Sequence, residues 1–138
     1  MTEQMNNRAG MKSFVLYLIP AFVILTLLIL FRTVLLIGYV PSESMEPTLE
    51  KDSFIVGYRL FNEIETGDII IFEREGTLMV KRVAACEGDI VYFNGQSQVV
   101  SNNCFYVLGD NSDNSYDSRY WSDPFVKRET VIAKLLFH

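Results

Sequence analysis

Two serines near the start of the chain stand in a stretch that is stiff and rich in hydroxyl groups. Ser42 and Ser44 lie between Pro41 and Pro47 in Gly38–Leu49, GYVPSESMEPTL. Each proline fixes its own φ and favours extended geometry in the residue before it, so this stretch cannot be an ordinary helix interior. A stiff turn that presents a hydroxyl group could hold a nucleophile. Because proline, serine and glutamate are also common in linkers, a linker is the alternative.

A serine nucleophile needs a base, and the sequence restricts which residue can serve. A serine hydroxyl is a poor nucleophile until a neighbouring group takes its proton. The single histidine is His138, the last residue, where order is least expected. The base for Ser42 or Ser44 would therefore be a lysine, an aspartate or a glutamate. A neutral lysine plays this part in Ser-Lys variants of the catalytic triad.

Lys81 is the lysine whose surroundings are unusual. It lies in Thr77–Ala85 (TLMVKRVAA), a predicted strand that is otherwise nearly apolar. Because side chains alternate along a strand, Lys81 shares a face with Met79 and Val83, whereas Arg82 lies on the other face. If Lys81 faces the core, desolvation lowers its pKa and leaves a neutral amine that can act as a base. The alternative is an edge strand, where a lysine prevents unwanted strand pairing.

A polar loop, Tyr106–Trp121 (YVLGDNSDNSYDSRYW), is the third candidate element. Its alternating Asp, Ser and Asn residues raise two alternatives, a calcium loop and a solvated turn that bonds its own backbone. Ser115 and Trp121 occupy the places where the calcium loop of an EF-hand needs Gly and Glu, which argues against calcium. One terminal histidine and two isolated cysteines also argue against a zinc site.

An apolar run comes before these elements. Phe14–Phe31 contains eighteen residues without a charge, between Lys12 and Arg32, which is long enough to span a membrane as a helix. A cleaved signal peptide would have a shorter apolar region, followed by a small-x-small site that this chain lacks. We therefore predict an N-terminal tail at residues 1–12 and a retained anchor at residues 13–38. The flanking cations slightly favour a cytoplasmic N-terminus.

The rest of the chain, residues 39–138, predicts a mostly β domain. Short apolar runs alternate with turn signals such as Thr66-Gly67-Asp68 and Asn94-Gly95. We expect a small, antiparallel, barrel-like catalytic domain, with the last segment a strand or a short helix. Its strands should fall at Ser53–Tyr58, Ile69–Phe72, Thr77–Ala85, Ile90–Phe93, Gln96–Val100, Cys104–Leu108 and Thr130–Phe137.

Charge and length limit the possible functions. The chain has 138 residues and a formal net charge of −5, which allows one domain and an anchor. The anchor region is slightly basic, whereas residues 39–138 carry nine Lys/Arg against sixteen Asp/Glu. An acidic domain is unsuited to nucleic acid, because phosphate neutralisation needs a basic face. We expect no nucleic-acid partner.

Four motifs in a fixed order behind the apolar run make a family resemblance specific. PSESMEPTL, GDIIIF, LMVKRVAACEGD and YVLGDNSDNSYDSRYW resemble the boxes of bacterial type I signal peptidases, over residues 38–121 together with the anchor. The resemblance implies a membrane-bound Ser-Lys endopeptidase without cofactor or metal. Its partners would be exported preproteins and the lipid bilayer. It would be single-pass in the cell membrane, with a cytoplasmic N-terminus and the catalytic domain on the outer face.

The resemblance also implies a role for each matching residue. Ser44 matches the nucleophile and Lys81 the general base, where the endoplasmic-reticulum branch of the family has histidine. Ser42 matches the side-chain donor of the oxyanion hole, alongside the backbone N–H of Ser44. Three residues of the last box match the serine that orients the lysine amine and the charged pair that holds the loop: Ser115, Asp117 and Arg119.

The chain also departs from the family pattern. Glu87–Asn103 is short, so the large second domain of longer relatives should be absent or vestigial. Cys86 stands where relatives often have an apolar residue, and Glu87 replaces the proline that follows it. Cys86 and Cys104 are open to two interpretations, a disulfide in an oxidising exterior or two small buried side chains.

Two other classes of protein remain as alternatives. A self-cleaving Ser-Lys protein of the stress-repressor type shares the catalytic pair, but the anchor and the missing DNA-binding domain argue against it. A non-catalytic anchored β module could keep the fold as a binding surface. Against it, the residues with matching roles are all present: Ser42, Ser44, Lys81, Ser115 and Arg119.

Overall fold

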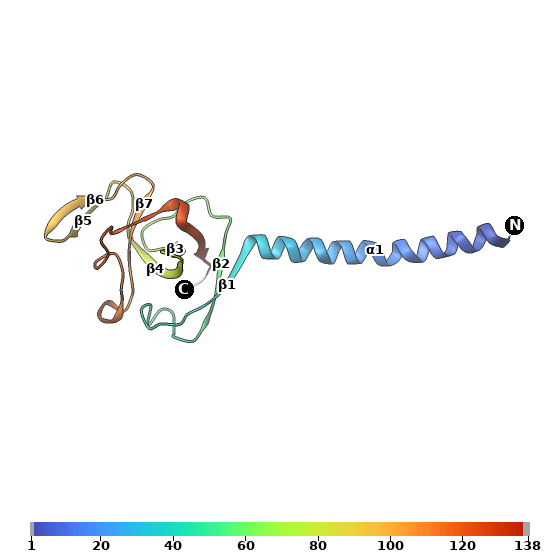
Figure 1. Ribbon diagram of the computed structural model, residues 1–138, viewed down its shortest axis with the longest axis horizontal. Helices are drawn as coiled ribbons and strands as arrows, with labels where there is room; N and C mark the ends of the chain where they lie inside the picture. The colour runs from blue at the N-terminus through green and yellow to red at the C-terminus, as the bar shows by residue number, and fades with distance from the viewer. Residues whose placement is uncertain (1, 137–138) are drawn as a thin grey trace. The chain divides into compact units, whose positions relative to one another are not determined.

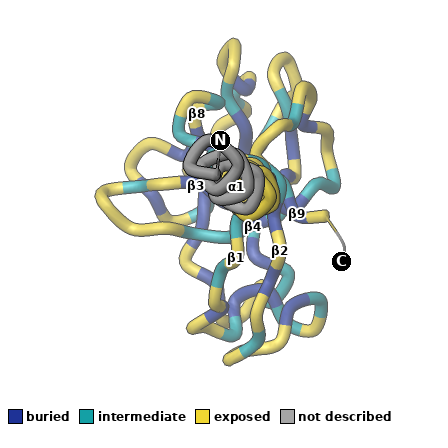
Figure 2. Tube along the Cα trace, turned by 90° about the vertical axis from the view of Figure 1, so that its right-hand side faces the viewer, coloured by how far each residue is buried: buried dark blue, intermediate teal, exposed yellow. Residues whose placement is uncertain are grey.

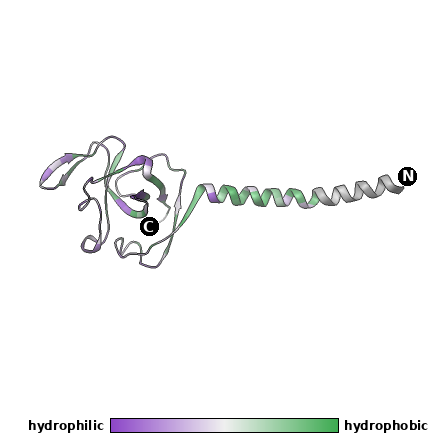
Figure 3. Ribbon diagram, in the orientation of Figure 1, coloured by the Kyte–Doolittle hydropathy of each residue, from purple (hydrophilic) through white to green (hydrophobic). Residues whose placement is uncertain are grey.

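The computed structural model describes residues 2–136, with side chains from Leu16 onward, and divides the chain into a helix and a β unit. Helix α1 (Thr2–Val34) carries one stretch, Leu16–Val34, that is long and apolar enough to cross a membrane. The described part of this helix is predominantly hydrophobic (Figure 3). His138 and the side chains of the predicted tail at residues 1–12 lie outside the described residues.

The β unit starts at residue 35 and consists of antiparallel strands (Figure 1). Seven strands form one sheet in the order β1-β2-β9-β3-β4-β7-β8, and β5 and β6 form a separate hairpin. Every hydrogen-bonded pair is antiparallel, so the predicted mostly β, antiparallel fold behind one apolar helix is confirmed. Among the described residues the sheet runs from β1 to β8 without closing into a complete barrel. The strands are β1 (Leu35–Tyr39), β2 (Phe54–Tyr58), β3 (Ile69–Arg74), β4 (Thr77–Ala85), β5 (Ile90–Phe93), β6 (Gln96–Val99), β7 (Cys104–Leu108), β8 (Phe125–Lys127) and β9 (Val131–Leu135), with short 3₁₀ turns at Ser112–Asn114 and Arg128–Thr130.

Strand β3 lies at the centre of the core because both of its faces are apolar. Ile70 and Phe72 pack into one cluster of buried side chains, while Ile69 and Ile71 pack into another. This is the expected result of side-chain alternation in a strand that has no polar positions over four residues. Figure 2 shows that buried residues lie mainly along the strands, whereas the turns between them are mostly exposed.

The predicted strands agree closely with the structure, and two further strands were not predicted. Residues 35–38, which the sequence analysis includes in the anchor, belong to β1 and pair with β2, with Ile37 opposite Val56. In the sequence these residues continue the apolar run. Their strand partner lies almost twenty residues further along the chain, so no local pattern marks them as a strand. Strand β8 has only three residues, Phe125–Lys127, too few for a visible alternation.

The two cysteines are free thiols that pack in different places. Cys86 lies against the core cluster that contains Phe105, whereas Cys104 lies against a separate cluster that contains Ala85 and Tyr106. Both thiols therefore act as small, partly buried side chains, which is the second of the two interpretations drawn from the sequence.

Candidate active site

The stretch with the two serines forms a compact turn whose ends are fixed by buried side chains. Val40, Met45 and Leu49 are nearly inaccessible and belong to the same core cluster. The backbone closes on itself through a hydrogen bond from the Leu49 N–H to the Met45 carbonyl, at 2.9 Å. Ser44 is buried within this turn, whereas Ser42 is exposed. The turn is thus an ordered part of the β unit and not a linker.

Lys81 contacts Ser44 directly. Lys81 Nζ and Ser44 Oγ form a hydrogen bond of 2.5 Å, and the lysine is only 5% exposed. Strand β4 places Lys81 on its buried face together with Val83, as alternation predicts, in register with Ile70 of β3. A charged amine donates this hydrogen bond, whereas a neutral amine can accept the Ser44 proton along the same line.

The charge state of Lys81 is set mainly by its burial. Desolvation lowers the pKa of Lys81 below its ordinary value. Among the nearby charges, Asp117 and Asp110 raise the pKa of Lys81, and Arg119 lowers it, but burial is the largest effect. The net lowering increases the fraction of neutral amine at moderate pH, which is the form that can take a proton from a hydroxyl group.

Ser42 lies beside the candidate nucleophile. The two hydroxyl oxygens, Ser42 Oγ and Ser44 Oγ, are 3.2 Å apart, and either can donate to the other. A hydroxyl group rotates about its C–O bond, so the Ser42 proton can also point at a negative charge that forms next to Ser44. Ser42 and Ser44 are thus adjacent, as the sequence spacing suggested.

A buried carboxylate organises the last box of the sequence. Asp117 is fully buried and accepts hydrogen bonds from the Ser115 hydroxyl at 2.7 Å and the Gly109 N–H at 2.9 Å. Arg119 adds two side-chain hydrogen bonds at 2.8 and 2.9 Å. Burial alone would raise the pKa of Asp117, but the hydrogen bonds from Arg119, Gly109 and Ser115 overcome it and lower the pKa. Asp117 therefore remains an anion inside the β unit.

Ser115 belongs to this network through the hydrogen bond that its hydroxyl group donates. Its hydroxyl group donates to Asp117, while the partner that the structure records for the Lys81 amine is Ser44. Because the Ser115 hydroxyl donates its hydrogen bond to the Asp117 carboxylate, its oxygen still has a lone pair that can accept from a nearby donor. The six residues singled out by the sequence thus form two hydrogen-bonded groups of three. One is Ser42–Ser44–Lys81 and the other is Ser115–Asp117–Arg119.

Gly109 lies where the polar loop packs tightly against the serine turn, the turn that carries Ser42 and Ser44. A Cβ atom at this position would overlap the Ser115 side chain and the Ser44 carbonyl oxygen. Only glycine lets the two segments approach this closely. No role for Gly109 is predicted from the sequence, although a glycine at the start of a polar loop is a signal of close backbone approach.

Arg82 lies on the other face of β4 and is paired with a carboxylate. This is expected, because the two faces of the strand cannot both be apolar core when each carries a cation. Its guanidinium group binds both carboxylate oxygens of Asp110, at 2.8 and 2.7 Å, and the Gly67 carbonyl at 2.7 Å. This bidentate pair fastens the start of the polar loop to β4 beside Lys81. The partner Asp110 was not predicted, because the pairing joins residues 28 positions apart.

Two asparagines of the same loop bind the residue between the serines. The Asn111 side-chain amide donates to the Glu43 backbone carbonyl, and the Asn111 N–H donates to the Ser44 carbonyl, both at 3.1 Å. The Asn114 amide donates to the Glu43 carboxylate at 2.9 Å. Sequence reasoning did not identify these contacts, since asparagine in a polar loop is also the residue expected to cap its own turn.

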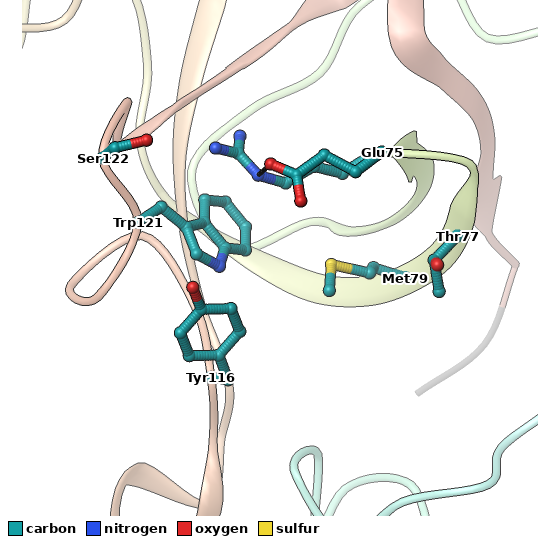
Figure 4. Close-up of a pocket in the computed structure, with 7 residues that line it drawn as sticks. Glu75, Thr77, Met79, Tyr116, Trp121 and Ser122 are labelled. Carbon is teal, nitrogen blue, oxygen red and sulfur yellow. Dashed lines mark ion pairs between the residues drawn. The ribbon is translucent and has the colours of Figure 1, made fainter.

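A small pocket lies next to the candidate site, along the first half of β4. Its volume is about 150 Å³, and Figure 4 shows Trp121 and Tyr116 on one side of it with Met79 and Thr77 on the other. Met79 comes two residues before Lys81 on the same face of the strand. The Trp121 indole N–H is buried and has no hydrogen-bond partner among the described residues. Seven residues line the pocket: Arg74, Glu75, Thr77, Met79, Tyr116, Trp121 and Ser122.

Comparison with known proteins identifies the class to which this fold and site belong. The family described as signal peptidase, peptidase S26 matches residues 11–99 and, in a second overlapping stretch, residues 92–138. The chain therefore belongs to the S26 signal peptidase family. The match covers most of the apolar helix α1, the turn with Ser42 and Ser44, β4 and the polar loop.

Individual relatives carry signal peptidase names. The chain is 34% identical to a probable signal peptidase I-2 of Synechocystis sp., over 70% of this chain and 59% of that protein. It is 32% identical to a signal peptidase I of Leptolyngbya laminosa, over 70% of this chain and 64% of that protein. The chain thus spans roughly three fifths of the length of these curated relatives. A protein of Staphylococcus aureus named inactive signal peptidase IA is 26% identical, over 91% of each chain.

Proposed function

We propose that this chain is a membrane-bound serine endopeptidase that cleaves N-terminal signal peptides from exported preproteins with a Ser-Lys pair. The observation that carries the proposal is the 2.5 Å hydrogen bond between Lys81 Nζ and Ser44 Oγ, two buried groups from segments 37 residues apart. Family membership and the names of the relatives support the substrate class.

The reaction would proceed through an acyl-enzyme. Ser44 Oγ attacks the scissile carbonyl carbon while neutral Lys81 takes the hydroxyl proton. The tetrahedral intermediate collapses as the C–N bond breaks, and the Lys81 ammonium gives its proton to the leaving amine. Water then attacks the ester carbonyl with Lys81 again as the base. Ser44 is released as the hydroxyl, and the second product carries a free carboxylate.

Two donors would stabilise the oxyanion of the tetrahedral intermediate. They are the Ser42 hydroxyl group, 3.2 Å from Ser44 Oγ, and the backbone N–H of Ser44. A donor of this kind contributes about 3–4 kcal/mol to transition-state stabilisation in other acyl-transfer enzymes. Ser42 therefore affects the rate of the chemical step more than the binding of the substrate.

The Ser115–Asp117–Arg119 group would hold the Lys81 amine in place. Ser115 donates a hydrogen bond to Asp117, so toward the lysine its oxygen can act only as an acceptor. The ion pair between Asp117 and Arg119 keeps the carboxylate charged and fixes the loop that carries Ser115. In this proposal Ser115, Asp117 and Arg119 are positioning residues.

The anchor helix would keep the enzyme at the bilayer, where signal peptides also reside. The stretch Leu16–Val34 supports a single span by its length and composition. We propose a cell-membrane protein with a cytoplasmic N-terminus and the β unit on the outer face. Restricting enzyme and substrate to one surface raises their effective concentration without any additional contact.

A second candidate is a non-catalytic anchored module, which the name of the Staphylococcus aureus relative brings into consideration. The two candidates differ in whether the 138-residue chain in detergent cuts a preprotein at one internal bond. We expect cleavage by the natural chain and none by Ser44→Ala, with both proteins folded. Ser42→Ala should slow kcat by ~10²–10³-fold with little change in KM. Wild-type turnover by Ser44→Ala would refute the assignment of the nucleophile, and an inert natural chain would favour the second candidate.

A further inference from the structure

One residue of the polar loop holds the peptide group that comes just before the candidate nucleophile. The Glu43 carbonyl accepts a hydrogen bond from the Asn111 side-chain amide at 3.1 Å and a second from the Glu46 N–H at 3.1 Å. The Ser44 carbonyl accepts from the backbone N–H of Asn111, also at 3.1 Å. Asn111 thus binds the carbonyl groups on both sides of the Ser44 Cα atom.

The orientation of the Ser44 N–H follows from this arrangement. Glu43 C=O and Ser44 N–H belong to the same planar, trans peptide group, so they point in opposite directions. A donor that fixes the carbonyl therefore also fixes the direction of the N–H. Within the described part of the chain, the Ser44 N–H has no recorded acceptor, which leaves it free to bind a negative charge that forms beside Ser44 Oγ.

We propose that Asn111 is a positioning residue for the oxyanion-binding N–H of Ser44, an inference that rests on the function proposed above. Its amide aims the Glu43–Ser44 peptide plane and, by binding the carbonyl, polarises the N–H at the other end of the group. Such a donor must be in place before charge develops, because reorganisation during the reaction would cost part of its effect. Asn111 would act through the backbone and would not touch the substrate.

The same loop offers a matched control. Asn114 also donates its side-chain amide to Glu43, at 2.9 Å, but its acceptor is the carboxylate of the exposed side chain. That carboxylate is also bound by Lys51 at 3.0 Å, so its position does not depend on Asn114. Loss of the Asn114 amide removes one hydrogen bond between the same two segments without releasing the Glu43–Ser44 peptide plane.

The experiment compares Asn111→Ala and Asn114→Ala in the whole chain with its helix, with Ser44→Ala as the inactive reference. Because Asn111→Ala loosens an oxyanion donor without deleting it, we expect kcat to fall on the order of tenfold, less than for removal of a donor. KM and the apparent pKa of the pH–rate profile should be unchanged, since neither Lys81 nor the peptide-binding surface is altered. Asn114→Ala should keep kcat within about twofold of the natural enzyme.

A substrate-free measurement keeps this inference separate from the proposed function. In protein labelled with ¹⁵N-serine, Asn111→Ala should move the amide resonance of Ser44, because its peptide carbonyl loses a donor, while Asn114→Ala should leave that resonance nearly in place. Equal shifts in both variants, or an unshifted Ser44 resonance in Asn111→Ala, would overturn the inference even if the chain cleaved no preprotein. If the natural chain is active, equal kcat for the two variants, or a loss confined to KM, would overturn it as well.

Discussion

In the proposed mechanism, the chemistry of the candidate site depends on Lys81. A lysine that is 5% exposed has lost most of its hydration, and desolvation disfavours its charged form. The site tolerates the buried Lys81 amine because Ser44 accepts a hydrogen bond from it and because Asp117 adds an opposite charge nearby. Burying the amine costs stability in the charged state and gives reactivity in the neutral state.

The pH dependence of stability should show this cost. Because the folded pKa of Lys81 is lowered, the unfolded chain binds a proton that the folded chain has lost between that pKa and the ordinary value of 10.5. The free energy of unfolding should therefore rise with pH across this window, and the cost of the buried charge is fully present below it. Chemical denaturation at several pH values checks this against Lys81→Met, in which this contribution is absent. Parallel curves for the two proteins would contradict the lowered pKa.

At the residue scale, a candidate functional residue could be predicted from the sequence where its side chain is unusual for its surroundings. Lys81 stood out in an apolar strand, and alternation predicted the face on which it is buried. The contacts from Asn111 and Asp110 could not be predicted, because they join loop residues to Glu43 and Arg82 across long sequence separations. In a turn, asparagine and aspartate are equally expected to form hydrogen bonds with their own backbone.

At the scale of elements, two loops and one strand bring the site together. Strand β4 supplies Lys81, the turn after β1 supplies Ser42 and Ser44, and the loop after β7 supplies the supporting network. Alternation and turn signals predicted β3, β4, β5 and β7 because these strands carry their pattern locally. Strand β1 could not be separated from the apolar run, since its identity depends on pairing with β2. The approach of the loop to the serine turn is a tertiary feature that no local pattern encodes.

Gly109→Ala tests that approach. A methyl group at this position would overlap Ser115 and the Ser44 carbonyl, both of them in tightly placed segments. We expect the loop to move away, with activity reduced by at least about tenfold and stability lowered by about 1–3 kcal/mol. Thermal unfolding and preprotein cleavage provide the two readouts. Gly95→Ala, in the hairpin between β5 and β6, is the control: a Cβ there meets nothing within 4 Å, so its positive φ of 78° is the only source of strain, and activity should be unchanged. Unchanged activity in Gly109→Ala would show that the loop does not need this close approach.

At the scale of the whole molecule, the chain consists of an apolar helix and a β unit, and each carries a separate part of the proposal. In the proposed function the helix is the membrane anchor, and the β unit carries the catalytic groups. The flanking charges of the helix only slightly favour one orientation, so the side of the membrane is the feature least determined by the sequence.

Protease accessibility in sealed inside-out and right-side-out vesicles checks the orientation. With a cytoplasmic N-terminus, a protease added to right-side-out vesicles should digest the β unit, whereas inside-out vesicles should protect it. The protein should also stay in the membrane fraction after alkaline extraction, because Leu16–Val34 is long enough to span the bilayer. The reverse pattern of protection would invert the proposed topology, and extraction into the soluble fraction would contradict the anchor.

The central claim is that neutral Lys81 is the base for Ser44, and Lys81→Arg tests it most directly. Arginine keeps the positive charge and much of the length of the side chain, but its guanidinium group does not give up its proton at accessible pH. Cleavage of a preprotein by this variant of the whole chain should therefore be measured from neutral to alkaline pH beside the natural enzyme. We predict that the natural enzyme gains activity with rising pH through an apparent pKa below 10.5, while folded Lys81→Arg stays inactive throughout. An active Lys81→Arg enzyme would show that another group is the base and would contradict the Ser-Lys mechanism.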